Sequence, residues 1–392
     1  MFFSLKLATS LVILLIVIVV TLLTQYNAII GNSTITNTTG MDSNDSDRVK
    51  KCFDSGGQYR DYISATNIPI HYNKLLNITE RYRNVYSRSD ATAVSSLIEK
   101  MFIDTFISYN LSFFSGMIPL FVEWSDYTRK FNIHNQNQKE LFKPLLCQLR
   151  PDIIYIVVSQ SNNGLEFLDR AYPNILQLSS GGEGHIALPL LKGFALPIQP
   201  IGEHFPKYNL SFYGSSYHGN GRKRIVDCLQ KRIGHHLNLD LNIVIGFLNN
   251  WKDEAALSSL NLAPEGYGRG TYRLSEIIQM GRVPVLTYKD EPWIPYRGSN
   301  ISVEYIGIIT KSSDKGAEEL INVMKSLKLS RVFEMIERVQ LARYYYTIEG
   351  VLEQMKLFFT DPLGPNGGAL CCKRRSSYIR NELYLLGEQQ NL

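Results

Sequence analysis

The stretch 262–286 constrains the fold of this chain more than any other, because it predicts a strand, a glycine-rich loop, a helix and a second strand in succession. The three glycines of the loop permit positive φ angles and a close approach of the backbone to another group. Thr271 is suited to cap the N-terminus of the helix, and Gly281 is suited to end it. The stretch therefore predicts one βαβ unit of a parallel sheet.

The start of this predicted helix carries charged residues that suit an anionic ligand. A helix N-terminus presents unpaired N–H groups and a partial positive charge. Arg273 and Glu276 are three residues apart, so both fall on one face of the helix. A guanidinium can bind two phosphate oxygens, and a carboxylate can accept hydrogen bonds from ribose hydroxyls. With Gly266, Gly268 and Arg269, these residues predict a site for a nucleotide diphosphate.

Two other interpretations of this loop remain open. It can be an ordinary turn of an α/β domain, with Arg273 and Glu276 as a solvent-exposed pair. It also resembles a dinucleotide-binding fingerprint, because alternate glycines precede a helix and Asp290 follows at the distance expected of a ribose ligand. The third glycine comes one residue too early for that fingerprint. A P-loop is excluded because no Gly-Lys-Ser/Thr follows.

Short apolar runs alternate with predicted helices along much of the chain. Strands are expected at 153–158, 174–178, 210–213, 243–247, 283–287 and 306–310. Helices are expected near 222–233, 252–258, 314–328, 331–341 and 346–358. This alternation predicts an α/β fold of two Rossmann-like parallel-sheet domains, at 49–205 and 206–345. A helical tail over 346–392 is expected to pack back on the body.

The N-terminus predicts the cellular compartment. The run 7–24 is almost wholly apolar and uncharged, and its apolar part would form a helix about 25 Å long, which suits a thin early-secretory membrane. Lys6 precedes the run and the next basic residue is Arg48, so residues 1–6 are expected to stay cytosolic. We therefore expect a single signal-anchor helix and a lumenal body. A cleaved signal peptide is the alternative.

Asn-x-Ser/Thr sequons agree with a lumenal body and predict surface loops that carry N-glycans. They begin at Asn32, Asn37, Asn44, Asn77, Asn110, Asn209 and Asn300. Residues 25–48 are rich in polar residues and are expected to form a disordered, glycosylated stem. The chain has five cysteines, so in an oxidising compartment at least one is unpaired or intermolecular.

Neither a metal site nor a nucleic-acid site is expected. The acidic pair Asp45 and Asp47 lies in the expected stem, where we interpret it as solvated linker, and His235 and His236 are adjacent rather than at helical ligand spacing. Arginines and a helix dipole would then replace a cation at the donor. The net charge of +5 is diffuse, and basic runs such as 222–224 are too short to indicate nucleic-acid binding.

The segment 262–296 holds a longer motif in which each step has a defined residue type. It contains a Pro-x-Gly loop, an aromatic-Arg step, a helical glutamate, a glycine and an x-Pro-Val strand, which are Pro264 to Gly266, Tyr272-Arg273, Glu276, Gly281 and Val283-Pro284-Val285. The motif resembles the donor side of exostosin-like glycosyltransferases. A weaker resemblance over 150–260 includes Gly214 followed by Arg224, which is similar to the family's Gly-then-Arg step.

The resemblance implies a GT-B architecture and a type II membrane protein of the Golgi or endoplasmic reticulum. Such a protein would transfer a sugar from a UDP-linked nucleotide donor to a glycan acceptor, with inversion and without a metal. The implied donor-binding residues are Arg224, Gly266, Gly268, Arg269, Arg273 and Glu276. A catalytically degenerate lumenal protein that binds a glycan or assists a partner transferase is the alternative.

Two details of the resemblance bear on catalysis. The loop 181–185 resembles a family segment with an acid and a histidine beside glycines, so Glu183 or His185 is the candidate base; the same glycines can equally serve only to turn the chain. Glu265 stands where family members usually carry a basic residue. Either Arg269 supplies the missing charge or donor binding is weakened. Trp293 and Tyr296 can stack on a sugar or base, or belong to the core.

Overall fold

The computed structural model describes residues 67–83, 97–130, 138–161, 165, 168, 172, 174–193, 195–215, 220–235, 241–362 and 367–370. By its contacts the chain divides into Met1–Ser46 and Asp47–Leu392, and the described residues all belong to the second unit. The expected anchor at 7–24, the stem at 25–48 and the three stem sequons lie outside the described residues. Within those residues, no helix has the length and apolar character needed to cross a membrane.

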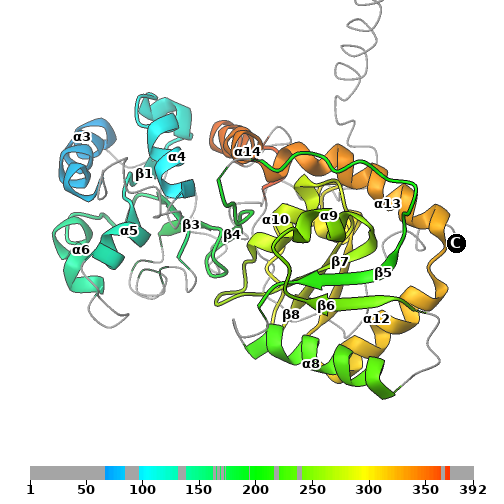
Figure 1. Cartoon of the computed structure of the whole chain (residues 1–392). Helices are drawn as coiled ribbons and strands as arrows, with labels where there is room; N and C mark the ends of the chain where they lie inside the picture. The colour runs from blue at the N-terminus through cyan, green and yellow to red at the C-terminus, as the bar shows by residue number, and fades with distance from the viewer. Residues whose placement is uncertain are drawn as a thin grey trace, which may run out of the picture. The chain divides into compact units, whose positions relative to one another are not determined.

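A five-stranded parallel sheet forms the larger half of the described fold (Figure 1). Its order is β6-β5-β7-β8-β9, with β5 at Tyr208–Tyr213, β6 at Ile243–Gly246, β7 at Ser258–Pro264, β8 at Pro284–Tyr288 and β9 at Ile308–Lys311. The helices that connect these strands are α8 at Asn220–His235, α9 at Trp251–Ala256, α10 at Tyr272–Gln279 and α11 at Val303–Ile306, and α12 at Asp314–Ser326 follows the last strand. The strand-helix alternation predicted for this half is confirmed.

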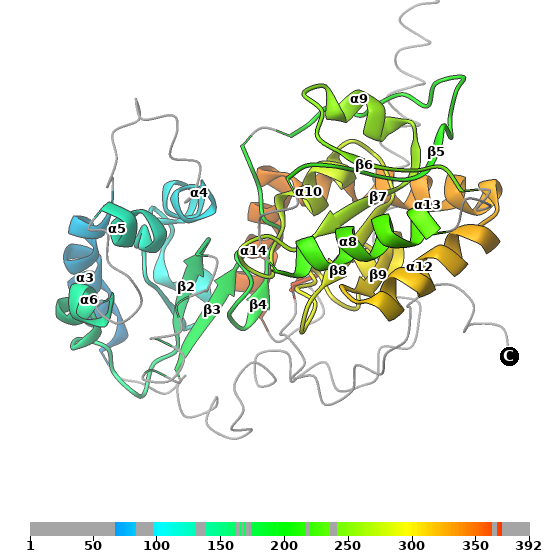
Figure 2. The ribbon, with the colours of Figure 1, turned by 60° about the horizontal axis from the view of Figure 1, so that its bottom comes forward.

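Helices cover both faces of this sheet, as a parallel sheet requires. The helices α8 and α12 lie on one face, and α9 and α10 lie on the other (Figures 1 and 2). Successive residues of β7 show the division, because Leu262 packs in the cluster with α8 and α12 whereas Ala263 packs in the cluster with α10. The loops that follow the carboxyl ends of β5 and β7 thus lead into α8 and α10.

A four-stranded parallel sheet forms the other half, in the order β1-β2-β3-β4. Its strands are β1 at Ile118–Pro119, β2 at Tyr155–Ser159, β3 at Ile175–Ser179 and β4 at Ile186–Ala187, and every strand residue is buried. The surrounding helices are α3 at Ile68–Thr79, η3 at Glu80–Tyr82, α4 at Leu97–Phe106, η5 at Leu111–Phe114, α5 at Trp124–Lys130 and α6 at Gln138–Leu146. The chain is therefore a mixed α/β protein with two parallel sheets.

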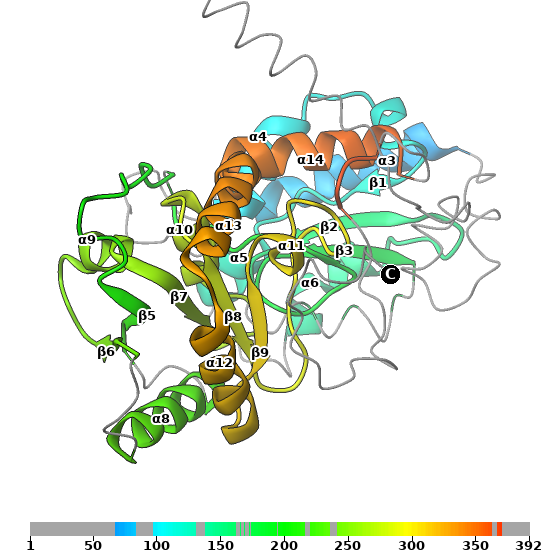
Figure 3. The same cartoon turned by 90° about the vertical axis from the view of Figure 1, so that its right-hand side faces the viewer.

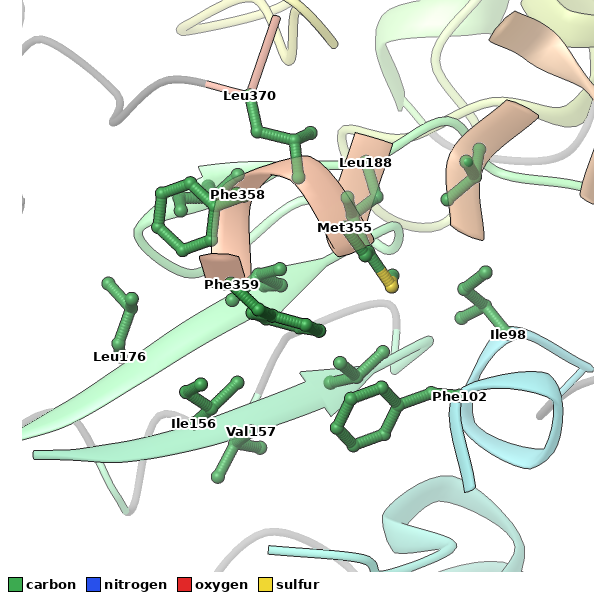
Figure 4. Packing of buried hydrophobic residues seen from close by; sticks show 14 of the residues in the cluster. Ile98, Phe102, Ile156, Val157, Leu176, Leu188, Met355, Phe358, Phe359 and Leu370 are labelled. Atoms are coloured by element: carbon green, nitrogen blue, oxygen red, sulfur yellow. The ribbon is translucent and has the colours of Figure 1, made fainter. Parts of the chain in front are cut away.

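The last described helices return the chain to the four-stranded sheet. They are α13 at Leu329–Ala342, η6 at Arg343–Tyr346 and α14 at Ile348–Thr360, and α14 lies beside α4 (Figure 3). Figure 4 shows Met355, Phe358 and Phe359 of α14 over β2 and β3, with Phe102 of α4 beside them. The Phe359 ring centroid is 6.0 Å from that of Phe102 and 5.4 Å from that of Phe114. Helix α14 therefore packs on the four-stranded sheet and on α4.

A buried arginine, Arg282, hydrogen-bonds three backbone segments that precede strands β5, β7 and β8. Arg282 has 0% exposure, and its Nε, Nη1 and Nη2 donate to the carbonyls of Ala256, Gly281 and Pro200 at 2.8, 3.1 and 2.8 Å. Its guanidinium also lies 5.7 Å from the centre of the Phe205 ring. Burial lowers the pKa of Arg282 to about 10, so the group stays charged at neutral pH.

The sequons within the described residues occupy different settings. Asn110 and Asn300 are exposed outside regular helices and strands, as expected of glycan acceptors. Asn77 is exposed on helix α3. Asn209 lies in β5, and its Oδ1 accepts a hydrogen bond from the backbone of Asn242 at 2.7 Å. The expectation of surface loops therefore does not hold for Asn77 or Asn209.

Candidate functional site

The predicted start of α10 is present in detail. Thr271 is the N-cap, and its Oγ1 accepts a hydrogen bond from the backbone N–H of Arg273 at 3.3 Å. Gly281 follows the end of the helix with φ +72°, a conformation that favours glycine. Both expectations are confirmed. The cap places Tyr272 and Arg273 in the first turn, at the carboxyl end of β7.

Arg273 lies between an aromatic ring and a carboxylate. Its guanidinium carbon is 3.6 Å from the centre of the Trp251 ring on α9, and its Nε is 3.4 Å from Glu276 Oε2. The side chain of Arg273 is 18% exposed. Burial lowers the pKa of Arg273 to about 10, with Glu276 acting in the opposite direction and Arg222 adding to the lowering. Arg273 is thus a positioned, partly desolvated cation, and it shares a helix face with Glu276 as predicted.

A second arginine, which the sequence analysis left in a basic run, joins this cluster. Arg222 lies in the first turn of α8, where its Nε donates to the carbonyl of Glu265 at 3.2 Å and its Nη1 to that of Ser215 at 3.4 Å. Burial lowers the pKa of Arg222. The glycines that follow β5 and β7 lie beside the two guanidinium groups, since a Cβ on Gly214 would lie 3.6 Å from Arg273 Nη2, and one on Gly266 would lie 3.6 Å from Arg222 Nη2.

Arg224, which the resemblance implies as a donor ligand, lies on a different side of α8. It is exposed, whereas Arg222 is half-buried. Two residues turn an α-helix by about 200°, so the two side chains face nearly opposite ways. The loops after β5 and β7 therefore bring Arg222 and Arg273 together and leave Arg224 outside the cluster.

This difference between the two arginines of α8 gives a direct test. Arg222→Ala is expected to weaken UDP binding by about ten-fold, because one partly desolvated cation is lost from the cluster. Arg224→Ala is expected to change it by less than about two-fold, because the charge is exposed and screened. Isothermal titration of both variants with UDP measures this. Equal losses in the two variants would contradict the assignment.

Arg269 links the loop 265–271, called the donor loop after what the resemblance implies, to the candidate catalytic loop 181–185. Its Nη1 is 2.9 Å from Glu183 Oε1 and 3.6 Å from Glu291 Oε2. The loop backbones also meet, since the N–H of Gly270 donates to the carbonyl of Gly181 at 3.0 Å. The expected residues Glu183 and Arg269 are thus brought into contact. Two carboxylates already balance the charge of Arg269, so it does not supply a spare cation.

Glycine is required where these two loops touch. A Cβ on Gly182 would lie 2.5 Å from the backbone nitrogen of Arg269, and Gly182 has φ +131°. A Cβ on Gly270 would lie 2.2 Å from the carbonyl oxygen of Ser180. Both distances are too short for any side chain without movement of the backbone. The close contact explains why glycines stand in both loops, in addition to any role at a ligand.

His185 takes part in the backbone ladder rather than in this contact. The ring Nδ1 of His185 accepts a hydrogen bond from the backbone N–H of Gln177 at 3.0 Å. The backbone N–H of His185 donates to the carbonyl of Gln177 at 2.9 Å. The residue therefore continues the pairing of β3 with β4. Of the two candidate bases, Glu183 is the one that lies against the donor loop.

Tyr272 connects the motif to a buried carboxylate that the sequence analysis did not identify. Its hydroxyl accepts from Gln160 Nε2 at 3.1 Å, and the backbone N–H of Gln160 donates to Glu99 Oε1 at 2.8 Å. Ser125 donates to Glu99 through its N–H at 3.0 Å and its hydroxyl at 2.5 Å. Burial raises the pKa of Glu99 to about 8 although these donors act in the opposite direction.

The raised pKa of Glu99 predicts that stability falls as the pH rises. At pH values between the pKa of Glu99 in the unfolded chain, near 4.5, and its pKa of about 8 in the folded protein, Glu99 is protonated in the folded state and ionised in the unfolded state. The free energy of unfolding should therefore drop by roughly 2 kcal/mol between about pH 6 and pH 8 from this group. Urea unfolding across that range measures it. Glu99→Gln should remove this part of the slope, and an unchanged slope in that variant would refute the prediction.

Glu265 lies beside the arginine cluster with its side chain buried. It is 7% exposed, and its backbone N–H donates to the carbonyl of Thr287 at 3.2 Å. Burial raises the pKa of Glu265, and the charge of Asp290 raises it further, whereas a hydrogen bond from the Lys289 backbone lowers it. Asp290 itself is exposed and pairs with Lys289. A buried acid therefore occupies the position at which the resemblance would place a basic residue.

The aromatic candidates for stacking lie in the core. Trp293 is 3% exposed and Tyr296 is 1% exposed. The hydroxyl of Tyr296 donates to the carbonyl of Tyr345 at 2.6 Å, and its ring meets that of Tyr346 edge-on at 5.6 Å. The interpretation of these two residues as core aromatics fits their burial. Exposed Tyr267 lies in the loop between β7 and α10, and Trp251 of α9 stacks on Arg273.

No family model matches the chain, and no curated protein matches it. Among the described residues, no group of three or more His, Cys, Asp or Glu side chains could hold a metal ion. The arrangement that remains is an arginine cluster at the carboxyl ends of β5 and β7, with Glu183 in the facing loop.

Proposed function

We propose that this chain is a lumenal glycosyltransferase that moves a sugar from a UDP-linked donor to a glycan acceptor, with inversion and without a metal. The observation that carries the proposal is the pairing of Arg222 and Arg273. Both guanidinium groups are partly desolvated, and the charge of Arg222 lowers the pKa of Arg273, so an anion that joins them would be favourable. Ligands of parallel α/β sheets also collect at the carboxyl ends of strands, where both arginines lie.

The donor side of the proposal assigns a role to each neighbouring residue. Arg273 lies over the Trp251 ring and would bind two phosphate oxygens, with Arg222 as its partner. Glu276, on the same helix face, would accept hydrogen bonds from the ribose hydroxyls. The glycines of the loop let the diphosphate approach the backbone. As the leaving group gains charge, the two guanidinium groups would stabilise it in place of a metal.

On the acceptor side of the proposed reaction, Glu183 would be the catalytic base. It follows β3 of the four-stranded sheet and reaches the donor loop through Arg269. A carboxylate at this position would take the proton of the acceptor hydroxyl as that oxygen attacks the anomeric carbon and the UDP leaves. Release of Glu183 from Arg269 would be required first. The proposed Golgi or endoplasmic-reticulum membrane location rests on the sequence features of residues 1–48.

A second function, that of a noncatalytic lumenal protein that binds a glycan or assists a partner transferase, is favoured by two specific observations. Glu265 and the pairing of Arg269 with Glu183 and Glu291 both reduce the positive charge available to a diphosphate. Such a protein would keep the fold and the loop contact and lack turnover.

A panel of UDP-sugars separates the two functions. The purified full-length chain is incubated with each donor and released UDP is measured, with Arg273→Ala as the inactive control. A transferase should release UDP from at least one donor and lose this activity in the variant. If no donor is consumed and none binds, the enzymatic proposal fails and the noncatalytic function replaces it.

A further inference from the structure

The first turn of α8 already holds an anion supplied by the chain itself. A Cβ placed on Gly221, in that turn, would lie 2.1 Å from Oε1 of Glu265 and 2.9 Å from its Cδ. The carboxylate of Glu265 therefore packs directly on the backbone of Gly221. The helix is 16 residues long, and its first turn carries the positive end of its dipole. Glycine at 221 is what allows the carboxylate to come so close.

This carboxylate lies between Arg222 of the proposed donor site and the residues that follow β8. Arg222, the next residue of α8, donates to the backbone carbonyl of Glu265 at 3.2 Å. The backbone of Lys289, after β8, donates to the carboxylate, and the charges of Lys289, Arg269 and Asp290 act on it. Glu265 is therefore held from two sides, by β8 with the following Lys289 and by α8. A flexible surface acid would not be held in this way.

We propose that Glu265 is a built-in competitor of the donor diphosphate, and that its negative charge limits how tightly the Arg222–Arg273 cluster holds a nucleotide diphosphate. This inference rests on the proposed function and names the residue that sets donor affinity. The carboxylate of Glu265 lies against the start of α8, and Arg222, the next residue, would bind the diphosphate, so the two anions would lie close together. Two like charges a few ångströms apart repel, even when partly screened.

The test compares UDP binding by the full-length chain and its variants at about pH 7.5, where the phosphates are ionised. Glu265→Gln keeps the size of the side chain and removes its charge, so UDP should bind about ten-fold more tightly. Glu265→Lys should bind at least as tightly as the glutamine variant. Asp290→Asn is the matched control, because it removes the same charge from an exposed neighbouring position and should change the affinity by less than about two-fold.

The outcomes separate the inference from the proposed function. If the wild-type chain binds UDP and Arg273→Ala abolishes this, while Glu265→Gln binds no more tightly, the donor site stands and the inference is overturned. If neither the wild-type chain nor either Glu265 variant binds UDP, both are overturned. Binding that appears only in the variants supports the inference. Circular dichroism and thermal melting of each variant show that the fold is intact, and the lysine variant gives a second reading if the glutamine variant does not fold.

Discussion

Replacement of Arg273 by alanine is expected to weaken UDP binding by about 100-fold or more, the largest functional loss of any single change in the chain. Arg273 is partly buried, stacked on Trp251 and paired with Glu276. The alanine variant lacks the planar guanidinium that can hydrogen-bond two phosphate oxygens. The carboxylate of Glu276 would then face the diphosphate without its partner. Titration with UDP measures the loss.

The matched variant for this prediction is Arg273→Lys. It keeps the positive charge but lacks the planar fork and the flat stacking on Trp251. Binding should therefore fall by about ten-fold, between the wild-type chain and the alanine variant. Equal affinity in all three proteins would show that UDP does not bind at this cluster.

Arg282→Ala is expected to lower the free energy of unfolding by about 3 to 5 kcal/mol, the largest stability loss that we predict. The buried guanidinium donates to three carbonyls, those of Ala256, Gly281 and Pro200. Alanine leaves these oxygens buried without their donor and leaves a cavity as well. The loss should appear in urea unfolding and as a lower melting temperature.

Arg331→Ala serves as the control for this stability prediction. Arg331 lies on α13 and pairs with Glu334 on the same helix, with both side chains partly exposed. Exposed pairs of this kind contribute little, so the change should be within about 0.5 kcal/mol. If Arg282→Ala were as small, the buried arginine would not be holding the three segments together.

Much of the five-stranded half could be predicted from the sequence, because its βα units are short and regular. The strands were predicted within a few residues, and Thr271 and Gly281 marked the ends of α10. The four-stranded half was predicted only at β2 and β3. Strand β1 has two residues, and so does β4, which is too short for any hydrophobic pattern to be seen.

The residues of the candidate site could be predicted where one segment of the chain supplies them. They could not be predicted where distant segments of the chain meet. Arg273 and Glu276 are neighbours on one helix, so their spacing was sufficient. Arg222 belongs to a basic run, and only the rotation of α8 separates it from exposed Arg224. Glu99 is 173 positions from the motif residue that it reaches through Gln160, and no local pattern encodes such a link.

The position of α14 has a consequence for how the chain matures. Its aromatic side chains cover β2 and β3 of the four-stranded sheet, yet α14 is made after nearly every other described element. The first sheet to leave the ribosome therefore waits for the last helix before its apolar surface is sealed. Until α14 is made, the apolar surface of β2 and β3 must be shielded from water by other groups. The order in which the two sheets are synthesised is therefore not the order in which they are completed.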